Sequence, residues 1–277
     1  MVVYSWVVIA SIDTGLIGFE DEGPRGPDAL LLIHGHPFNR SMWKPQLSVV
    51  AAMGWRVIAP DLRGYGESAT ATGVAAFEDF AKDLLRLLDA LSIDRFVVGG
   101  LSMGGQIAMD VCRQVPERVR GLLLAATFPQ KESEEGKLRR SAMADRLLRE
   151  GMAGYAAEVL PKMVGATCQR ERPEIGQAVL GMMQATDPRG AAAALRARAQ
   201  RPPYEDVLAR FVRPSTVVVG DEDAFTSRAD ADQMSSLLKD CELCWLNGVG
   251  HMPNLERPDD FNAVLARLLE RVGPGSR

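Results

Sequence analysis

Short apolar runs alternate with longer segments of helical period along most of the chain. Runs rich in Val, Ile and Leu predict buried strands, and apolar residues spaced three or four apart predict amphipathic helices. The predicted strands lie near residues 29–33, 56–60, 95–99, 119–126, 216–220 and 241–246. The predicted helices lie near residues 42–52, 77–91, 103–115, 228–238 and 258–272. This alternation is typical of an α/β fold with a mostly parallel sheet flanked by helices.

Two segments depart from this alternation. Residues 1–10 are apolar but lack a basic region and are too few to span a membrane, so they predict a first strand. Residues 128–206 carry no strand pattern, are rich in Ala, Met, Glu and Arg, and are interrupted by prolines. We expect roughly four short helices there, packed either over the sheet or as an excursion on its flank. A capping box of Ser227 and Asp230 is expected to begin the helix at 228–238.

Composition and charge fit one globular α/β domain with an insertion. The chain has 277 residues, of which 47% are apolar and 25% charged, and its formal net charge is −4. A chain of this length can bury a large core, and its acidic balance argues against nucleic acid as a partner. Basic residues gather at 137–140 and 196–201, where we interpret them as solvated helix faces.

The four cysteines do not form a disulfide framework in a chain of this length. Cys241 and Cys244 form a Cys-x-x-Cys pair, but the pair lies within a predicted strand and has no second pair to complete a zinc site. We interpret both as ordinary strand residues and expect a reducing, cytoplasmic location without a membrane partner.

Gly100, Ser102 and Gly104 form a Gly-x-Ser-x-Gly motif between a predicted strand and a predicted helix. This context is the one in which the motif presents a nucleophilic serine on a strained turn. Glycines two residues to either side let the strand and the helix approach closely. The start of the helix also supplies free N–H groups where negative charge develops during acyl transfer. Taken alone, the motif is equally compatible with an ordinary glycine-rich turn.

Few residues can serve as partners of such a serine, because the chain contains only His34, His36 and His251. His251 follows the last predicted strand, from which a loop can reach a serine at the carboxyl edge of a parallel sheet. A surface loop histidine is the alternative. An orienting acid is expected between serine and histidine, since the fold with this motif orders its triad in that way. Asp223 is the first candidate and Asp221 the second, and the rest of that acidic turn is solvated.

Several motifs now stand in a fixed order along the chain. They are His34-Gly-His-Pro37, the segment 60–68, Gly100-Leu-Ser-Met-Gly104, Gly220-Asp-Glu-Asp223 and Gly248-Val-Gly-His251. On these motifs the sequence resembles the α/β-hydrolase superfamily over nearly its whole length. The resemblance implies a sheet of about eight strands, a core of residues 1–127 and 207–277, and a helical cap of residues 128–206 inserted after the sixth strand. It also favours Asp223 over Asp221.

The resemblance assigns roles to the residues of the site. Ser102 is expected to be the nucleophile, His251 its general base and Asp223 the orienting acid. The backbone N–H groups of Met103 and His36 are expected to form the oxyanion hole.

Further roles concern the loop after the third strand. The N–H of Phe38 is a weaker candidate for the oxyanion hole, and Pro37 has no N–H to offer. His34 is expected to order the loop, whereas the side chains of His36 and Phe38 are expected to contact substrate. No metal and no organic cofactor is required by this chemistry.

A serine at position 102 limits the classes of reaction that the enzyme can catalyse. Haloalkane dehalogenases and epoxide hydrolases of this fold use an aspartate nucleophile, so Ser102 argues against both. The motifs are similar to those of carboxylesterases, cofactor-free haloperoxidases and 3-oxoadipate enol-lactonases. We predict a serine hydrolase that cleaves a carboxylic ester of small or medium size through an acyl-enzyme, with water as second substrate. The alternatives are an enol-lactone hydrolase or a perhydrolase on the same triad.

Two questions stay open at this stage. The same fold also serves non-catalytic small-molecule receptors, since function resides in the site and not in the fold. A carboxylate-binding arginine in the cap would favour a lactone or another acidic substrate, but the sequence does not say which arginine faces inward. The methionines of the cap fit either an adaptable pocket lining or ordinary core packing.

Overall fold

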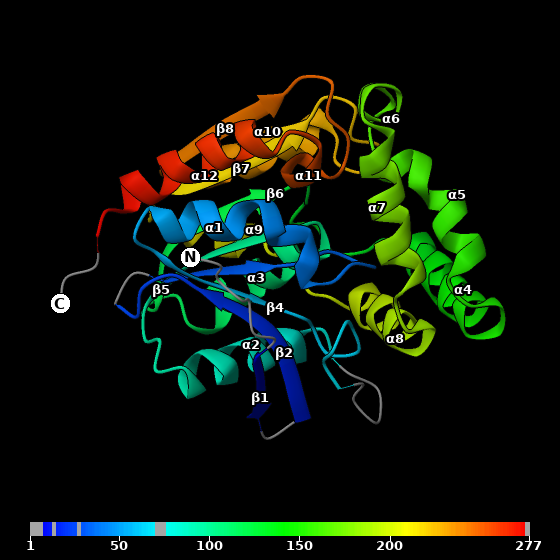
Figure 1. The fold of residues 1–277 in the computed structure, drawn as a ribbon, viewed down its shortest axis with the longest axis horizontal. Helices are drawn as coiled ribbons and strands as arrows, with labels where there is room; N and C mark the ends of the chain where they lie inside the picture. The colour runs from blue at the N-terminus through cyan, green and yellow to red at the C-terminus, as the bar shows by residue number, and fades with distance from the viewer. Residues whose placement is uncertain (1–7, 13–14, 27–28, 70–75, 275–277) are drawn as a thin grey trace, which may run out of the picture.

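The computed structural model describes residues 8–12, 15–26, 29–69 and 76–274. Within them, eight strands form one sheet in the order β1-β2-β4-β3-β5-β6-β7-β8 (Figure 1). The pairs β1–β2 and β2–β4 are antiparallel, and all other neighbours are parallel. The predicted α/β fold with a mostly parallel sheet is therefore confirmed. Of the strand predicted at residues 1–10, the first seven residues lie outside the described part.

The strands agree closely with the apolar runs of the sequence. Their bounds are β1 Val8–Ile12, β2 Gly15–Glu22, β3 Ala29–Ile33, β4 Arg56–Pro60, β5 Phe96–Leu101, β6 Val119–Ala125, β7 Ser215–Gly220 and β8 Cys241–Leu246. The five strands β3 to β7 are completely buried because helices cover both faces of the sheet. Sequence analysis did not delimit β2, whose buried residues are followed by an acidic stretch rather than by a longer apolar run.

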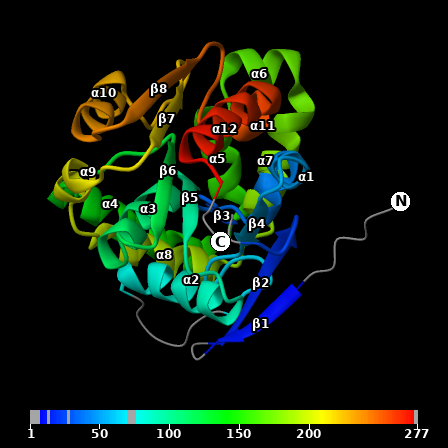
Figure 2. The same ribbon diagram turned by 90° about the vertical axis from the view of Figure 1, so that its left-hand side faces the viewer.

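Alternate residues of the central strands enter two separate apolar layers. In β3, Leu31 and Ile33 belong to one layer, and Leu30 and Leu32 to the other, as the two-residue repeat of a strand requires. The helices of the core are η1 Arg40–Trp43, α1 Lys44–Ala52, α2 Glu78–Ala90, α3 Met103–Gln114, α9 Glu205–Arg210, α10 Arg228–Leu237, α11 Pro253–Glu256 and α12 Pro258–Val272. Figure 2 shows α1 and α12 on one side of the sheet and α2, α3 and α10 on the other.

A group of five helices lies between β6 and α9, beside the sheet in Figure 1. They are α4 Glu134–Glu150, α5 Ala153–Met163, α6 Ala166–Glu171, α7 Pro173–Gln184 and α8 Pro188–Ala199. Sequence analysis expected about four. It gave no bounds for them, and the structure has the six-residue α6 directly before α7, which begins at Pro173.

These five helices touch the loops that follow parallel strands. A Cβ atom placed on Gly190 of α8 would lie 1.8 Å from the carbonyl oxygen of Gly64, which follows β4. A Cβ atom on Gly250, which follows β8, would lie 2.2 Å from the backbone nitrogen of Gly165. Loops after parallel strands meet at the carboxyl edge of the sheet, so α8 and the segment between α5 and α6 contact that edge. A separate cap of residues 128–206 stays a prediction.

Two smaller predictions, the capping box and the strand position of the cysteine pair, can be checked in the same structure. Ser227 and Asp230 form the expected capping box at the start of α10, and Cys241 and Cys244 are strand residues with free thiols. In the part of the chain that the structure describes, no cluster of His, Cys, Asp and Glu could hold a metal ion. Nor does any helix of that part have the length and apolar character needed to cross a bilayer.

The contact between Gly64 and Gly190 predicts how substitutions in the five helices affect stability. Gly190→Ala forces the two backbones apart and should lower the free energy of unfolding by about 1–3 kcal/mol. The matched control is Gly176→Ala in α7, where an added Cβ meets nothing within 4 Å and should raise stability by about 0.5–1 kcal/mol. Urea unfolding measures both. Equal effects of the two substitutions would contradict this packing.

Candidate active site

Ser102 is the single residue between β5 and α3, and its backbone has φ 56° and ψ −115°. A serine at positive φ is strained by about 1–3 kcal/mol, so the surroundings must hold it there. Its N–H donates to the carbonyl of Ala125 at 2.9 Å, and its own carbonyl accepts from the Thr127 hydroxyl at 2.7 Å. The end of β6 therefore fixes the turn that presents the Ser102 side chain.

The glycines of the motif are required because neighbouring backbone atoms leave no room for a Cβ atom. A Cβ atom on Gly100 would lie 2.1 Å from the carbonyl oxygen of Gly104, and a Cβ atom on Gly104 would lie 2.1 Å from that of Ile33. Gly105 is equally confined, because its Cβ would lie 2.6 Å from the Thr127 methyl group. No larger residue fits while the strand and the helix cross at this separation.

The loop after β3 runs directly beside Ser102. A Cβ atom on Gly35 would lie 3.4 Å from the Cβ atom of Ser102. Within the described residues, the backbone N–H groups of His36 and Met103 donate no hydrogen bond, whereas the N–H of Phe38 donates to the carbonyl of Gly35 at 3.0 Å. The two N–H groups predicted for an oxyanion hole are thus free in this structure, and the alternative donor is occupied.

The ring of Phe38 is completely buried in the apolar layer that contains Met42 and Trp43. It therefore contributes to the core packing beside the loop, and its predicted contact with substrate stays a prediction.

His34 orders this loop, as its hydrogen bonds indicate. Its Nε2 atom accepts the backbone N–H of Leu62 at 2.9 Å, so the ring proton resides on Nδ1, which donates to the carbonyl of Gly35 at 2.9 Å. Burial lowers the pKa of His34, which favours this neutral form. His34 therefore joins the loop after β3 to the loop after β4 and has no nitrogen left for proton transfer.

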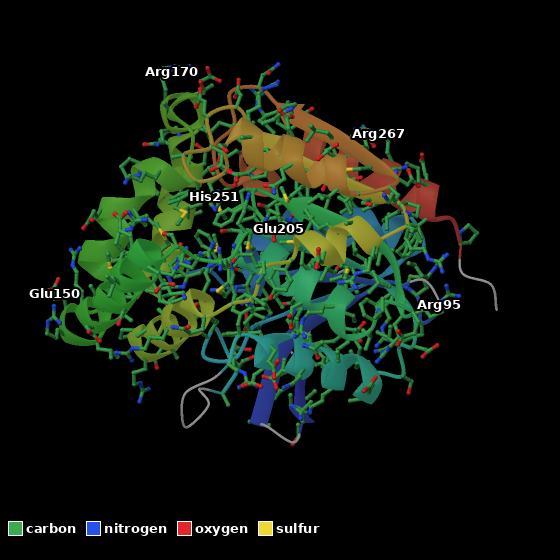
Figure 3. The ribbon with its side chains drawn as sticks, turned by 180° about the vertical axis from the view of Figure 1, so that it is seen from behind. Arg95, Glu150, Arg170, Glu205, His251 and Arg267 are labelled. Carbon is green, nitrogen blue, oxygen red and sulfur yellow. The ribbon has the colours of Figure 1, made fainter. Side chains whose placement is uncertain are left out.

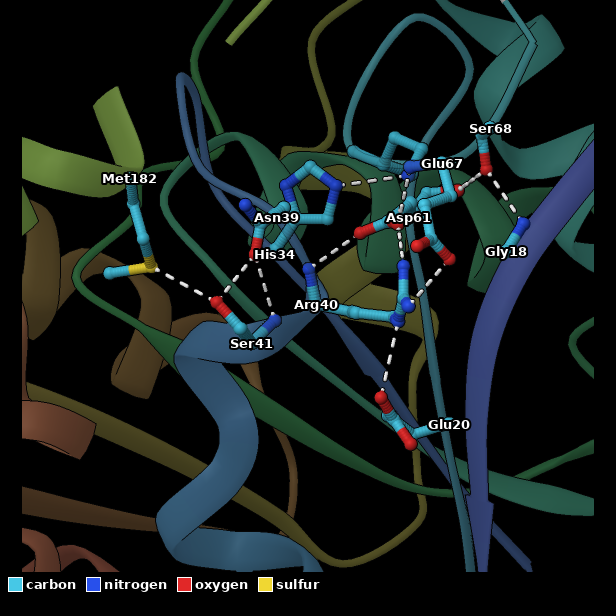
Figure 4. Close-up of polar contacts among 11 residues, drawn as sticks. Gly18, Glu20, His34, Asn39, Arg40, Ser41, Asp61, Glu67, Ser68 and Met182 are labelled. Carbon is cyan, nitrogen blue, oxygen red and sulfur yellow. Dashed lines mark hydrogen bonds and ion pairs between the residues drawn. The ribbon is translucent and has the colours of Figure 1, made fainter. Parts of the chain in front are cut away.

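Asp61 also anchors these two loops (Figure 4). Its buried carboxylate accepts the N–H of Arg40 at 2.8 Å and that of Glu67 at 2.9 Å, and it pairs with the Arg40 guanidinium. Its carbonyl accepts the hydroxyl of Ser68, whose oxygen accepts the N–H of Gly18 on β2. This network explains the motif at 60–68 as a support of the site.

The imidazole of His36 lies among aromatic rings. Its Nδ1 atom is 2.7 Å from the Tyr65 hydroxyl, and its ring centroid is 6.2 Å from that of Tyr155. Burial lowers the pKa of His36 well below its ordinary value, and the charges of Arg198 and Arg140 add to the effect. The ring is therefore neutral, and its buried Nε2 atom has no partner among the described residues.

Asp223 and His251 form a direct pair. The Nδ1 atom of His251 lies 2.9 Å and 3.0 Å from the two carboxylate oxygens, and the Asp223 side chain is completely buried. Burial would raise the pKa of Asp223, but the adjacent His251 charge and the N–H groups of Phe225 and Thr226 lower it below its ordinary value. An ionised Asp223 holds the proton on Nδ1, which leaves Nε2 of His251 free to accept one.

Asp221 has a different task. Its carboxylate accepts the N–H of Gly248 at 2.6 Å and that of Val249 at 3.3 Å. It shapes the loop that carries His251 but does not touch the imidazole. The geometry thus agrees with the preference for Asp223 that the resemblance suggested.

The structure brings Ser102 and the Asp223–His251 pair to one edge of the sheet but does not join them by a hydrogen bond among the described residues. Ser102 follows β5 and Asp223 follows β7, and these parallel strands flank β6. Figure 3 shows His251 near the junction between the five helices and the sheet. The side chains of Ser102 and His251 are both buried.

Glu256 was missed by sequence analysis. Its buried carboxylate accepts three backbone N–H groups, from Gly165 at 2.9 Å, Gly250 at 2.9 Å and Met252 at 2.9 Å. Gly250 and Met252 flank His251, and Gly165 lies between α5 and α6. Burial raises the pKa of Glu256 although these donors oppose the shift. One carboxylate therefore fixes the histidine segment and ties the five helices to it.

The interpretation of residues 196–201 as a solvated face was wrong in part. Arg196 is exposed and pairs with Asp145, but Arg198 is only 8% exposed and Arg201 only 3%. This face of α8 packs against the core, and the Nε atom of Arg198 donates to the side-chain oxygen of Gln106 on α3 at 2.8 Å. The sequence pattern alone did not indicate this contact.

Comparison with known proteins shows the family to which the chain belongs. The model of the alpha/beta hydrolase family matches residues 30–264, and the chain belongs to that family of hydrolases. It is 28% identical to the pimeloyl-(acyl-carrier protein) methyl ester esterase of Nitrosospira multiformis, over 88% of this chain and 94% of that protein. It is 23% identical to 3-oxoadipate enol-lactonase 1 of Acinetobacter baylyi, over 96% and 97%.

Solved structures give the same result. A thermophilic esterase from Thermogutta terrifontis, solved with malate bound, superimposes with a TM-score of 0.91 and is 33% identical, with 98% of this chain and 100% of that chain covered. The enol-lactonase from Burkholderia xenovorans has the same fold, with a TM-score of 0.87 and 24% identity over 95% and 100%. The family that the motifs suggested is therefore confirmed, and the chain is an enzyme of the hydrolase class.

The three N–H contacts of Glu256 predict an effect on turnover. Glu256→Gln places an amide NH2 against one backbone N–H, which should cost about 1–3 kcal/mol of stability and misalign His251. We expect kcat for a p-nitrophenyl ester to fall about tenfold with little change in KM. The control is Glu222→Gln, since Glu222 also anchors this region, through Thr167, but does not touch Gly250 or Met252. A similar loss of kcat in both variants would contradict the assignment.

The lowered pKa of Asp223 predicts how stability depends on pH. A carboxyl with a depressed native pKa binds fewer protons folded than unfolded, so its contribution is complete above the ordinary Asp value of 3.8 and is lost as the pH falls through the native value. The free energy of unfolding of the wild type minus that of Asp223→Asn should be constant near neutral pH and shrink below pH of about 4. A difference independent of pH would argue against an ionised, paired Asp223.

Proposed function

We propose that this protein is a serine hydrolase that cleaves carboxylic esters of small or medium size through an acyl-enzyme on Ser102. The observation that carries the proposal is the buried Asp223–His251 pair, which leaves Nε2 of His251 as a base at the edge of the sheet where Ser102 is presented. The free N–H groups of His36 and Met103 beside that serine support it further.

The reaction follows from these positions. Nε2 of His251 takes the hydroxyl proton of Ser102 as the serine oxygen attacks the ester carbonyl carbon. The carbon–oxygen bond to the alcohol then breaks, and the imidazolium gives its proton to the departing oxygen. Water attacks the acyl carbon, returns a proton to Nε2, and the acid leaves as Ser102 regains its proton. Asp223 keeps the imidazole in the required tautomer and stabilises its cation.

The oxyanion hole supplies the largest electrostatic contribution. The N–H groups of His36 and Met103 would donate to the carbonyl oxygen as it becomes negative, and each such donor is worth about 3–4 kcal/mol in the transition state. His34 and Asp61 support this arrangement by holding the His36 loop against Ser102.

We also propose that residues 128–206 form a cap on a core of residues 1–127 and 207–277. The contacts of Gly165 with Glu256 and of Gly190 with Gly64 support this division, because both lie where the helices meet loops at the carboxyl edge. Helices in that position would shape the substrate pocket over Ser102.

An ester is favoured over other substrates by the solved esterase at 33% identity. Enol-lactone hydrolysis is the second candidate, supported by the relatives named as enol-lactonases. Perhydrolysis on the same triad and a non-catalytic receptor are the remaining alternatives. The receptor alternative has the least support, since a histidine hydrogen-bonded to a buried carboxylate, at the same edge of the sheet as a strained serine, has no role in a passive pocket.

A serine-directed fluorophosphonate probe tests the proposal. Folded wild-type protein should be labelled at Ser102, and Ser102→Ala should lose both the label and the turnover of esters, by at least about 10³-fold, without unfolding. The exposed Ser236 on α10 provides a control, because Ser236→Ala should keep both. Folded wild-type protein that takes no label at Ser102 would sink the proposal.

A substrate panel separates the remaining alternatives. It contains p-nitrophenyl esters of graded acyl length, an enol-lactone, and acetate with hydrogen peroxide. Preference for the esters supports the first candidate, and a higher kcat/KM for the lactone or for peracid formation would replace it.

A further inference from the structure

Arg198 of α8 is linked to the proposed nucleophile through Gln106, which lies one helical turn after Ser102 on α3. Its Nε atom donates to the side-chain oxygen of Gln106 at 2.8 Å, and the N–H of Gln106 donates to the carbonyl of Ser102 at 3.2 Å. The guanidinium charge also lowers the pKa of His36 and opposes the rise in the pKa of Tyr155, so both side chains are near it. An arginine of α8 thus stands among residues of the proposed oxyanion loop and the elbow.

Arg198 belongs to a cluster in which three arginines, Arg140, Arg198 and Arg201, lie around one glutamate, Glu132. Glu132 accepts hydrogen bonds from both Arg140 and Arg201. Within the described residues no Asp or Glu forms an ion pair with Arg198, although it is only 8% exposed. Burial lowers the pKa of Arg198 well below its ordinary value, and Arg140 and Arg201 lower it further. A buried cation without a partner is unfavourable, and an anion beside it would remove that penalty.

Hydrogen-bond donors around Arg198 are also unused. Only its Nε atom donates to a described residue, so both terminal nitrogens of the guanidinium are free. The side-chain nitrogen of Gln106 and Nε2 of His36 are buried and have no partner among the described residues. A purely structural arginine would use its terminal nitrogens on carbonyls, as Arg201 does with the carbonyls of Gln130 and Arg198.

We propose that Arg198 binds a carboxylate of the substrate, so that the enzyme prefers esters or lactones whose acyl chain ends in a carboxylate a few carbon atoms from the scissile carbonyl. The inference rests on the proposed function, because it places that carbonyl at Ser102. The two terminal nitrogens of a guanidinium match the two oxygens of a carboxylate, and the amide nitrogen of Gln106 lies beside them to donate a further bond. Because the single residue Gln106 connects Arg198 to Ser102, only a short acyl chain can extend from the scissile carbonyl to the guanidinium.

The test compares two esters of equal shape. They are 4-nitrophenyl hydrogen glutarate, which ends in a carboxylate, and 4-nitrophenyl 5-methylhexanoate, in which an isopropyl group replaces it. Wild-type kcat/KM should favour the glutarate ester by about tenfold or more, since a hydrogen bond to a charged group commonly has that effect. The succinate and adipate monoesters then define the chain length that the site accepts.

Arg198→Met should lower kcat/KM for the glutarate ester by about 10²-fold and change that for the neutral ester by less than about threefold. Arg198→Lys keeps the charge without the paired nitrogens and should give an intermediate loss. Arg196→Met, two residues away on the exposed face of α8, should change neither ester. Should Arg198→Met fail to fold, Arg198→Lys and the wild-type comparison carry the test.

The outcomes separate the two proposals. Wild-type protein that takes the fluorophosphonate label at Ser102 but hydrolyses the neutral ester as well as the anionic one overturns the role of Arg198 and leaves the serine hydrolase in place. Protein that takes no label overturns both. Equal losses for both esters in Arg198→Met would mean that Arg198 only supports the fold, through Gln106, and would also overturn the proposal.

Discussion

The backbone of Ser102 has a positive φ in a turn that has no room for a Cβ atom two residues to either side, and the rest of the site depends on this constraint. Gly100 and Gly104 bring β5 and α3 into backbone contact, and the same closeness admits the loop after β3 at Gly35. Because Ala125 and Thr127 hold the turn from β6, its strain is balanced by the central strands of the sheet.

Buried carboxylates position every other part of the site. Asp61 holds the loop after β3, Asp223 holds the imidazole, and Glu256 holds the segment around His251. Each accepts several N–H groups from loops that have no strand or helix partner, which satisfies buried donors that would otherwise be costly. The sheet places the loops approximately, and these acids determine their final conformation.

The sequence predicted the parts that repeat or that follow a motif. Apolar runs located the central strands within a residue or two, and the order of motifs identified Ser102, Asp223 and His251. The sequence did not predict contacts between distant segments. Glu256 is a single glutamate before the final helix, with no motif around it. Arg198 could not be distinguished by its sequence from its exposed neighbour Arg196. The complete burial of Phe38 was not indicated either, because burial depends on which segments pack across the chain. The catalytic roles themselves stay predictions.

The five helices are fastened to the core in two different ways. Near α6, Glu256 and Glu222 accept the backbone N–H groups of Gly165 and Thr167, and Glu256 also accepts that of Gly250 beside His251. Near α8, the contacts are the close approach of Gly190 to Gly64, the hydrogen bond of Arg198 to Gln106, and the apolar packing of small residues, Ala194 and Ala197, on the core. A lineage could therefore exchange residues along α8 and acquire new substrates while the machinery around His251 stays intact. The substrate preference set at α8 would then change in evolution independently of the turnover rate set around His251.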